Sequence, residues 1–328
     1  ITVDEVSALA KKHLNRKNMV IVAQGPSEGV KHITKEEAIA VLDKVESSNL
    51  EPYKDQVTEA SLINEDLKGS KIIATKKLPQ FDAEEWTLEN GAKVVFRKAD
   101  YEKDQVQVSS YSKGGTSLYG IDKLASAQVT DQFIGAYGLG DYDAITLRKL
   151  LTGKQVQAGV SIGGLSESVG GASTPNDFET LMQLIYLRFE KPRFDKEVHN
   201  TLMQRNYAAI ENSANNPQKI MQDSVSMIMS NYSPRTLLFG KEFLDKVSIE
   251  QIEEIYRDRI KDISDFTFFI VGNIDAETVK PLVEKYLGSV KSYNRKENWV
   301  DNKVRGPKGR TEKVIELDLT TPKATVIT

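Results

Sequence analysis

One pattern that occurs twice in the sequence constrains the fold of this chain more than any other feature. Thr2 is followed three residues later by Glu5, and Ser248 is followed in the same way by Gln251. This spacing is typical of a capping box, in which side chains and backbone N–H groups satisfy one another at the start of a helix. Each pattern therefore predicts a helix. An apolar run closed by glycine follows each predicted helix, at residues 19–23 and 267–271, and each run is expected to form a strand.

The repeated pattern has two interpretations. It indicates a duplicated unit of which only the end of the first copy is present, or it recurs without duplication because helix, strand and turn are a common sequence of elements. The chain begins with Ile1 in what reads as the start of a helix. We therefore expect a segment of a longer protein, whose signal peptide, if it has one, would lie upstream.

Between the two copies, the sequence predicts a single α+β unit. An amphipathic helix is expected near residues 35–45, with a linker from there to residue 80. The Asn-Gly pair at 90–91 predicts a hairpin over residues 86–97, because these residues supply the positive φ that such turns need. Further predicted elements are a strand at 105–111, two strands within 156–169 that fold back at Gly163 and Gly164, and helices at 121–134, from Thr174, at 195–211 and from Pro217.

These elements predict a division of the chain into successive parts. The largest is an α+β domain whose sheet carries its helices on one face. We expect a polar connector after it and then the opening strands of a further, truncated domain, over residues 314–319 and 324–328. The predicted parts are residues 1–30 (the end of a preceding domain), 31–80 (helix and linker), 81–290 (the α+β domain), 291–309 (the connector) and 310–328 (the start of the next domain).

The composition excludes several classes of protein. The 328 residues include 44 Lys and Arg against 47 Asp and Glu, a net charge of −3. This balance argues against a nucleic-acid partner, which requires a basic surface to displace counterions. No apolar run reaches the length of a membrane span, so we expect a soluble chain. Cysteine is absent, which excludes disulfides, thiolate metal ligands and cysteine nucleophiles.

The residues themselves indicate no catalytic or metal site. A zinc site without cysteine needs converging imidazoles, and the three histidines (His13, His32 and His199) are far apart in the sequence. The glycine pairs 163–164 and 170–171 match no phosphate-binding motif and are interpreted as turns. A serine nucleophile motif fails at its final glycine, at Ser168. The carboxylates that could form an acid/base pair, although no spacing rule requires it, are Asp141, Asp143 and Glu167.

Several segments together resemble one family. Residues 247–252, 269–275 and 282–288 look like the end of one domain of the pitrilysin/insulinase family of zinc peptidases. Residues 87–95 resemble the hairpin that opens such a domain, and residues 1–26 are similar to the end of the domain before it. The resemblance implies a mitochondrial-processing-peptidase-like metallohydrolase fold. It also implies two halves, each of two related domains, that close around a chamber for peptides.

The resemblance implies that this segment does not hold the family's zinc. Active members carry His-x-x-Glu-His on a helix after the opening strands, with two His as zinc ligands and the Glu as general base. Here the matching residues 126–130 read Ser-Ala-Gln-Val-Thr, and Ala208-Ala209 stand near the place of the third ligand. Glu211 lies close by in sequence but is not assigned as a ligand. No catalytic, cofactor-binding or metal-binding residue is therefore predicted in this chain.

Two functions of different classes remain. In the first, the chain is a non-catalytic, third-domain segment of a zinc metalloendopeptidase, helping to form the chamber for polypeptide substrates. Zinc and the catalytic half would then lie upstream in the same protein. In the second, the parent is a metal-free structural or peptide-binding subunit related to these peptidases. Bacterial members of the family suggest a periplasmic location, which no residue of this chain indicates.

Overall fold

The computed structural model describes all residues except 1, 14–15, 27, 50–60, 214 and 317–328, and it contains two compact units, Ile1–Gln56 and Val57–Thr328. In the first unit, Thr2 opens a helix as predicted. The Thr2 N–H donates to Glu5 Oε2 at 2.7 Å, and the Glu5 N–H donates to Thr2 Oγ1 at 3.2 Å. A second complete capping box starts at Thr34. The elements of this unit are α1 (Val3–His13), η1 (Arg16–Asn18) and α2 (Lys35–Ser47).

The apolar run at residues 19–23 is not a strand, contrary to the prediction. Its backbone is irregular, and Val20 and Val22 are both more than four-fifths exposed. A strand needs a neighbour to accept its hydrogen bonds, and no described strand of this unit pairs with the run. A continuous apolar run alone therefore did not make a strand here.

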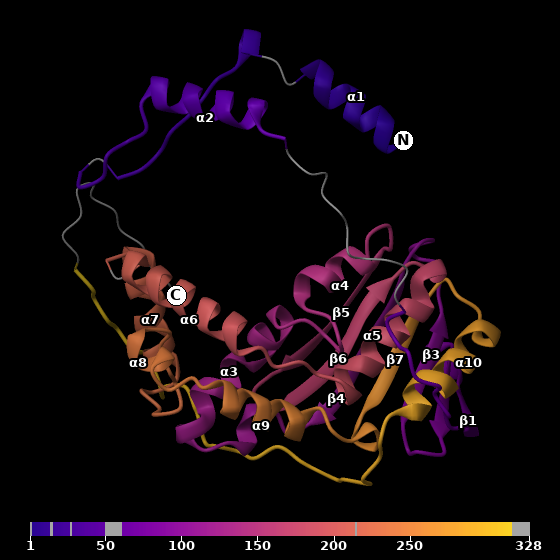
Figure 1. Cartoon of the computed structure of the whole chain (residues 1–328). Helices are drawn as coiled ribbons and strands as arrows, with labels where there is room; N and C mark the ends of the chain where they lie inside the picture. Colours follow the sequence, from indigo (N-terminus) through magenta and orange to yellow (C-terminus); the bar gives the residue numbers. More distant parts are fainter. Residues whose placement is uncertain (1, 14–15, 27, 50–60, 214, 317–328) are drawn as a thin grey trace. The chain divides into compact units, whose positions relative to one another are not determined.

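The second unit is built on one seven-stranded sheet in the order β1-β2-β3-β7-β4-β6-β5 (Figure 1). The predicted hairpin forms as β2 and β3, with Trp86 opposite Val94. β7 returns from far along the chain, lies parallel to β3 and antiparallel to β4, and so joins the two halves of the sheet. The strands are β1 (Ile72–Leu78), β2 (Ala83–Leu88), β3 (Lys93–Lys98), β4 (Val106–Lys113), β5 (Val156–Ile162), β6 (Ser166–Ser173) and β7 (Thr267–Gly272).

Helices pack on one face of this sheet, as predicted. Along β4, Val106, Val108, Ser110 and Ser112 are buried while the residues between them are exposed. The core between sheet and helices contains Trp86 and other large, fully buried side chains. The helices are α3 (Ile121–Ala136), α4 (Ala144–Leu150), α5 (Phe178–Glu190), α6 (Lys196–Ser213), α7 (Pro217–Met229), α8 (Lys241–Leu244), α9 (Ile249–Arg259) and α10 (Ala276–Tyr286), with short 3-10 turns η2 (Pro79–Phe81), η3 (Gly115–Leu118), η4 (Pro175–Asp177), η5 (Ile263–Asp265) and η6 (Leu287–Ser289).

The sheet begins earlier than the predicted boundary at residue 81. Strand β1 lies within residues 31–80, in the part predicted as a linker, and pairs with β2. Its side chains between the two ends are exposed and include Lys76 and Lys77. Lysines are common on edge strands because they discourage pairing with other chains. Because of these lysines the sequence lacks the alternating apolar residues that predict a strand, and the segment was predicted as a linker. The backbone just before β1 is also fixed, since the Ser70 N–H donates to the Glu284 carbonyl at 3.1 Å.

The two strands predicted near the end of the chain, at residues 314–319 and 324–328, fall mostly outside the described residues. Residues 314–316 have no strand, and the remainder of the two strands predicted after residue 314 lies outside the described residues. None of the described helices combines the length and the apolar character that a membrane span requires.

Candidate functional site

Helix α3 carries the residues that stand where the zinc signature was expected. Ser126, at the first of these positions, is fully buried. Its hydroxyl donates to Gln251 Oε1 at 2.7 Å and accepts from the Ser248 N–H at 3.1 Å. Ser248 in turn caps α9 by accepting from the Gln251 N–H at 3.2 Å. The side chain of Gln251 therefore binds Ser126 rather than completing a capping box, and Ser126 joins α3 to the start of α9.

The other signature positions serve the packing of the same helix. Val129 lies in the hydrophobic core, and Thr130 Oγ1 donates to the Ser126 carbonyl at 2.8 Å. Neither a valine nor a hydroxyl used in this way offers zinc a nitrogen or carboxylate ligand. The residues present on α3 therefore do not fit the zinc ion that the family resemblance implies. Across the described parts of the chain, no three His, Asp or Glu side chains gather closely enough to hold a metal ion.

Helix α6 offers no third ligand at the matching positions. Ala208, Ala209 and Glu211 are exposed on it. His199, near the start of the same helix, is buried, and its Nδ1 lies 2.8 Å from the hydroxyl oxygen of Tyr137. Burial lowers the pKa of His199, so the imidazole is held neutral in the core. This histidine is a packed core residue.

The other residues considered from the sequence lie apart from one another. His13 is exposed at the end of α1, and the Nε2 of His32 lies 2.7 Å from the Pro26 carbonyl oxygen. Asp143 caps α4 and is exposed. Its hydrogen bonds keep its pKa below the ordinary range, led by the bond from the Thr146 N–H. Asp141 is also exposed and has no role in that cap.

One of the two glycine pairs is not a turn. Gly163 and Gly164 connect β5 and β6 as predicted, but Gly170 and Gly171 lie inside β6. A Cβ on Gly171 would lie 1.9 Å from the carbonyl oxygen of Gln157, and one on Gly170 would lie 2.3 Å from that of Val108. Glycine is needed here because the strands on both sides approach closely.

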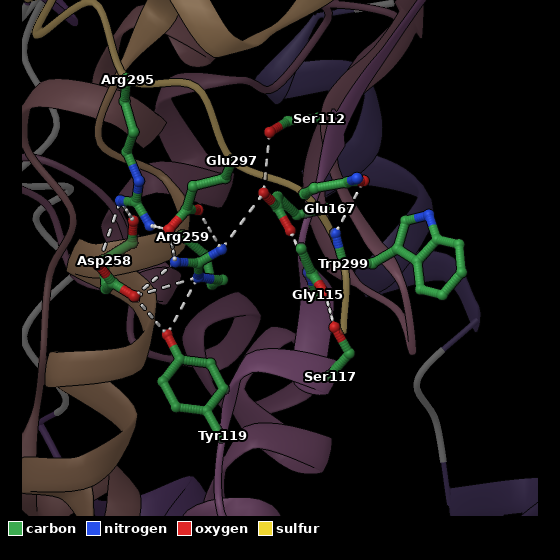
Figure 2. Close-up of polar contacts among 12 residues, drawn as sticks. Ser112, Gly115, Ser117, Tyr119, Glu167, Asp258, Arg259, Arg295, Glu297 and Trp299 are labelled. Atoms are coloured by element: carbon green, nitrogen blue, oxygen red, sulfur yellow. Dashed lines mark hydrogen bonds and ion pairs between the residues drawn. The ribbon is translucent and has the colours of Figure 1, made fainter. Parts of the chain in front are cut away.

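Glu167 belongs to a buried charge cluster that the sequence did not indicate (Figure 2). Its carboxylate accepts from the Ser112 hydroxyl at 2.9 Å and from the Gly115 N–H at 2.6 Å. Arg259 Nη1 lies 3.8 Å from the same carboxylate, and both side chains are 1% exposed. Burial raises the pKa of Glu167, although these donors oppose the increase.

Arg259 is the centre of this cluster. It donates to Glu297 at 2.7 Å, to Asp258 at 2.6 Å and to the Tyr119 hydroxyl at 3.0 Å. Although burial opposes the charged form, the hydrogen bonds that Arg259 donates to Glu297 and Asp258 raise its pKa. We call Arg259 and its carboxylate partners Glu167, Asp258 and Glu297 the clamp. Removing one partner would leave an uncompensated buried charge, so the clamp has a structural role.

The clamp fixes the connector that was predicted as residues 291–309. Glu297 binds Arg259, and the Arg295 N–H donates to Asp262 Oδ2 at 2.6 Å. Further along, the Val300 N–H donates to the Ser117 hydroxyl at 3.0 Å. The connector is therefore held against α9 and η3, close to the beginning of α3 (Figure 2).

The sheet face opposite the helices carries large exposed side chains. Tyr111, Phe269 and Val271 are 46%, 39% and 37% exposed. Phe269 on β7 lies in register with Val95 on β3 and Ser109 on β4. At one end of the sheet, β5 pairs only with β6 among the described strands. This leaves an open face and an available strand edge in the same domain.

Comparison with known proteins relates this chain to one peptidase family. Residues 246–327 match the family described as the peptidase M16 inactive domain. The resemblance to this peptidase family is thereby confirmed. The matched segment contains α9, β7 and α10, together with both Arg259 and Glu297 of the clamp.

Longer similarities extend over most of the chain. The probable zinc protease PqqL of Haemophilus influenzae is 22% identical over 253 residues, which are 75% of this chain and 26% of that protein. The zinc protease PQQL-like of Arabidopsis thaliana is 22% identical over 294 residues, 88% of this chain and 28% of that protein. The chain thus spans about a quarter of the length of the curated relatives it matches.

A solved structure has the same fold. The periplasmic protease PqqL from Escherichia coli matches with a TM-score of 0.65 and 18% identity, over 84% of this chain and 30% of that one. The same fold is therefore present here, with Ser126, Val129 and Thr130 where the sequence resemblance predicted the zinc ligands and the general base.

Proposed function

We propose that this chain is a non-catalytic segment of an M16 zinc metalloendopeptidase and helps to form the chamber in which that enzyme holds peptides. Hydrolysis would occur at a zinc site in an upstream half of the same protein. The observation that carries the proposal is Ser126. A hydroxyl bound to Ser248 and Gln251 stands where the resemblance predicts the first zinc ligand, which supports a helix that is kept for the fold and has no catalytic role.

The open sheet face and the β5 edge support a role in holding peptides. An extended peptide can add to a free strand edge through backbone hydrogen bonds, which give affinity without strict sequence preference. Exposed Tyr111 and Phe269 add apolar surface on the open face. We further propose that residues 81–290, with β1, act as the peptidase-like domain and that residues 1–30 and 310–328 belong to neighbouring domains. We also propose that the enzyme is periplasmic, as the name of the Escherichia coli protein states for that protein.

The proposal is tested by comparing three samples on one fluorogenic peptide: the full parent protein, the parent truncated before residue 1, and that truncated form mixed with this chain. We expect zinc-dependent hydrolysis by the full parent, little by the truncated form, and partial recovery on mixing. Hydrolysis by this chain alone would contradict the proposal. A parent inert to every peptide would favour the alternative, a metal-free structural or peptide-binding subunit.

A further inference from the structure

The connector forms one wall of a pair of adjoining hollows beside α3. The first, of about 410 Å³, lies between α3, the β5–β6 turn and the connector. The second, of about 610 Å³, lies between the start of α3, the loop after α7 and the connector. Arg235, Asn302 and Arg305 line both hollows, so the two are neighbours that share a wall.

Part of the lining of the first hollow is apolar, beside polar residues that include Gln128 and Asp301. Leu124 of α3 forms part of its wall and is almost fully buried, while Leu165 at the β5–β6 turn is 50% exposed. On the connector side, Trp299, Val300 and Val304 complete the wall, and Trp299 is 42% exposed. Exposed apolar side chains that gather around one hollow mark a binding surface more often than scattered ones do. Its volume lies in the range of ligand pockets and leaves ample room for an aromatic or branched aliphatic side chain.

The shared wall and the second hollow are positively charged. Arg235 donates to the carbonyl oxygens of Tyr119 at 2.8 Å and Thr116 at 3.1 Å, and no carboxylate of the described residues pairs with it. Lys303 also lines the second hollow. Arg305 is paired with Asp301 at 2.6 Å, so it adds no net charge. An oriented guanidinium without an acidic partner favours a carboxylate ligand.

We propose that these hollows together bind the C-terminal residue of a peptide, with its apolar side chain in the first hollow and its free α-carboxylate against Arg235. This inference extends the proposed function, on which it rests for the presence of peptides. Hydrolysis of a peptide bond creates a new α-carboxylate on the N-terminal fragment. The site would therefore recognise a cleaved fragment, or a substrate by its natural end, and would distinguish either from an internal stretch of chain.

The test compares two N-acetylated peptides of one sequence ending in Phe, one with a free C-terminal acid and one with a C-terminal amide. Trp299 is a convenient reporter, because the other tryptophan, Trp86, is buried and stacked on Phe96. We expect the acid to change the Trp299 fluorescence and to bind at least tenfold more tightly than the amide, a ratio typical of a charge-assisted hydrogen bond. Calorimetry on the same peptides gives the affinities independently.

Variants separate the charge from the fold. Arg235→Gln should abolish the preference for the acid, with its folding checked by thermal unfolding since Arg235 also binds two carbonyls. Lys303→Gln, at an exposed position, should weaken acid binding severalfold, and Asp301→Asn should strengthen it. Arg310→Gln is the matched control, because Arg310 pairs with Glu312 and lines neither hollow.

Equal affinity for the acid and the amide in the unaltered chain would overturn the inference, even if the parent protein hydrolyses peptides. So would an unchanged preference in both Arg235→Gln and Lys303→Gln. A preference for the acid in a chain whose parent is inert would support this site and contradict the proposed enzyme instead.

Discussion

At the scale of single residues, Ser126, which stands where the family resemblance predicted a zinc ligand, serves the fold. Its hydroxyl satisfies a backbone donor at the start of α9 and a side-chain acceptor on the same helix. Ser126 is fully buried and its two partners are half-buried, so the hydroxyl has these bonds in place of water. The family resemblance predicted the position of Ser126, but its partners lie more than 120 residues away and could not be predicted.

We therefore expect Ser126→Ala to lower the free energy of unfolding by about 1–3 kcal/mol, the cost of leaving buried polar groups unsatisfied. Urea denaturation followed by circular dichroism measures the change. Ser109→Ala on the open sheet face is the control and should alter stability by less than about 0.5 kcal/mol. Equal effects of the two substitutions would show that the Ser126 bonds contribute nothing.

His199 gives a prediction about pH. Burial lowers its pKa in the folded state, so the unfolded chain binds a proton more readily. The free energy of unfolding is therefore unaffected by this group above the unfolded pKa of about 6.5. It decreases as the pH falls below that value toward the folded pKa, because the unfolded chain then gains a proton. His199→Gln should reduce the fall in urea midpoint between about pH 7 and pH 5.5, whereas His13→Gln, at an exposed site, should leave it unchanged. An equal decrease in urea midpoint between about pH 7 and pH 5.5 in His199→Gln and His13→Gln would contradict this explanation.

At the scale of elements, local signals predicted those parts of the fold whose cause lies within a few residues. Asn90 and Gly91 predicted the β2–β3 hairpin, and Thr174 was correctly predicted to cap a helical segment, where it accepts from the Asp177 N–H at 3.2 Å. Strand β1 was missed because its exposed lysines resemble a linker. The fixed connector was missed because it depends on Arg259 and Glu297, which are 38 residues apart.

The connector should loosen when its clamp is weakened. In Glu297→Gln the buried Arg259 loses a charged partner, and we expect a loss of roughly 1–3 kcal/mol in stability. Hydrogen exchange should accelerate at the amides of Arg295 and Val300, which the connector uses to bind the domain. Glu312→Gln, which alters an exposed pair with Arg310, should leave these amides protected. Unchanged exchange in Glu297→Gln would show that the clamp does not hold the connector.

At the scale of the whole molecule, the α+β unit has the fold of the M16 structures. Helix α3, where the zinc signature was expected, contributes to packing. The seven-stranded sheet has one covered face and one open face, while α3 and α6 contribute serine, threonine and alanine where ligands were expected. Fold and chemistry are separable in this way because a fold does not by itself determine a function. We therefore expect that this chain holds no catalytic zinc.

Zinc content after dialysis against micromolar zinc tests that claim most directly. The chain is dialysed at neutral pH, freed of loosely bound metal and analysed by mass spectrometry, with a zinc-binding M16 relative treated in parallel. The account predicts well below one zinc per chain, since Ser126, Val129 and Thr130 supply neither imidazole nor carboxylate. One tightly held zinc per chain, lost when residues around Ser126 or Ala208 are substituted, would contradict it.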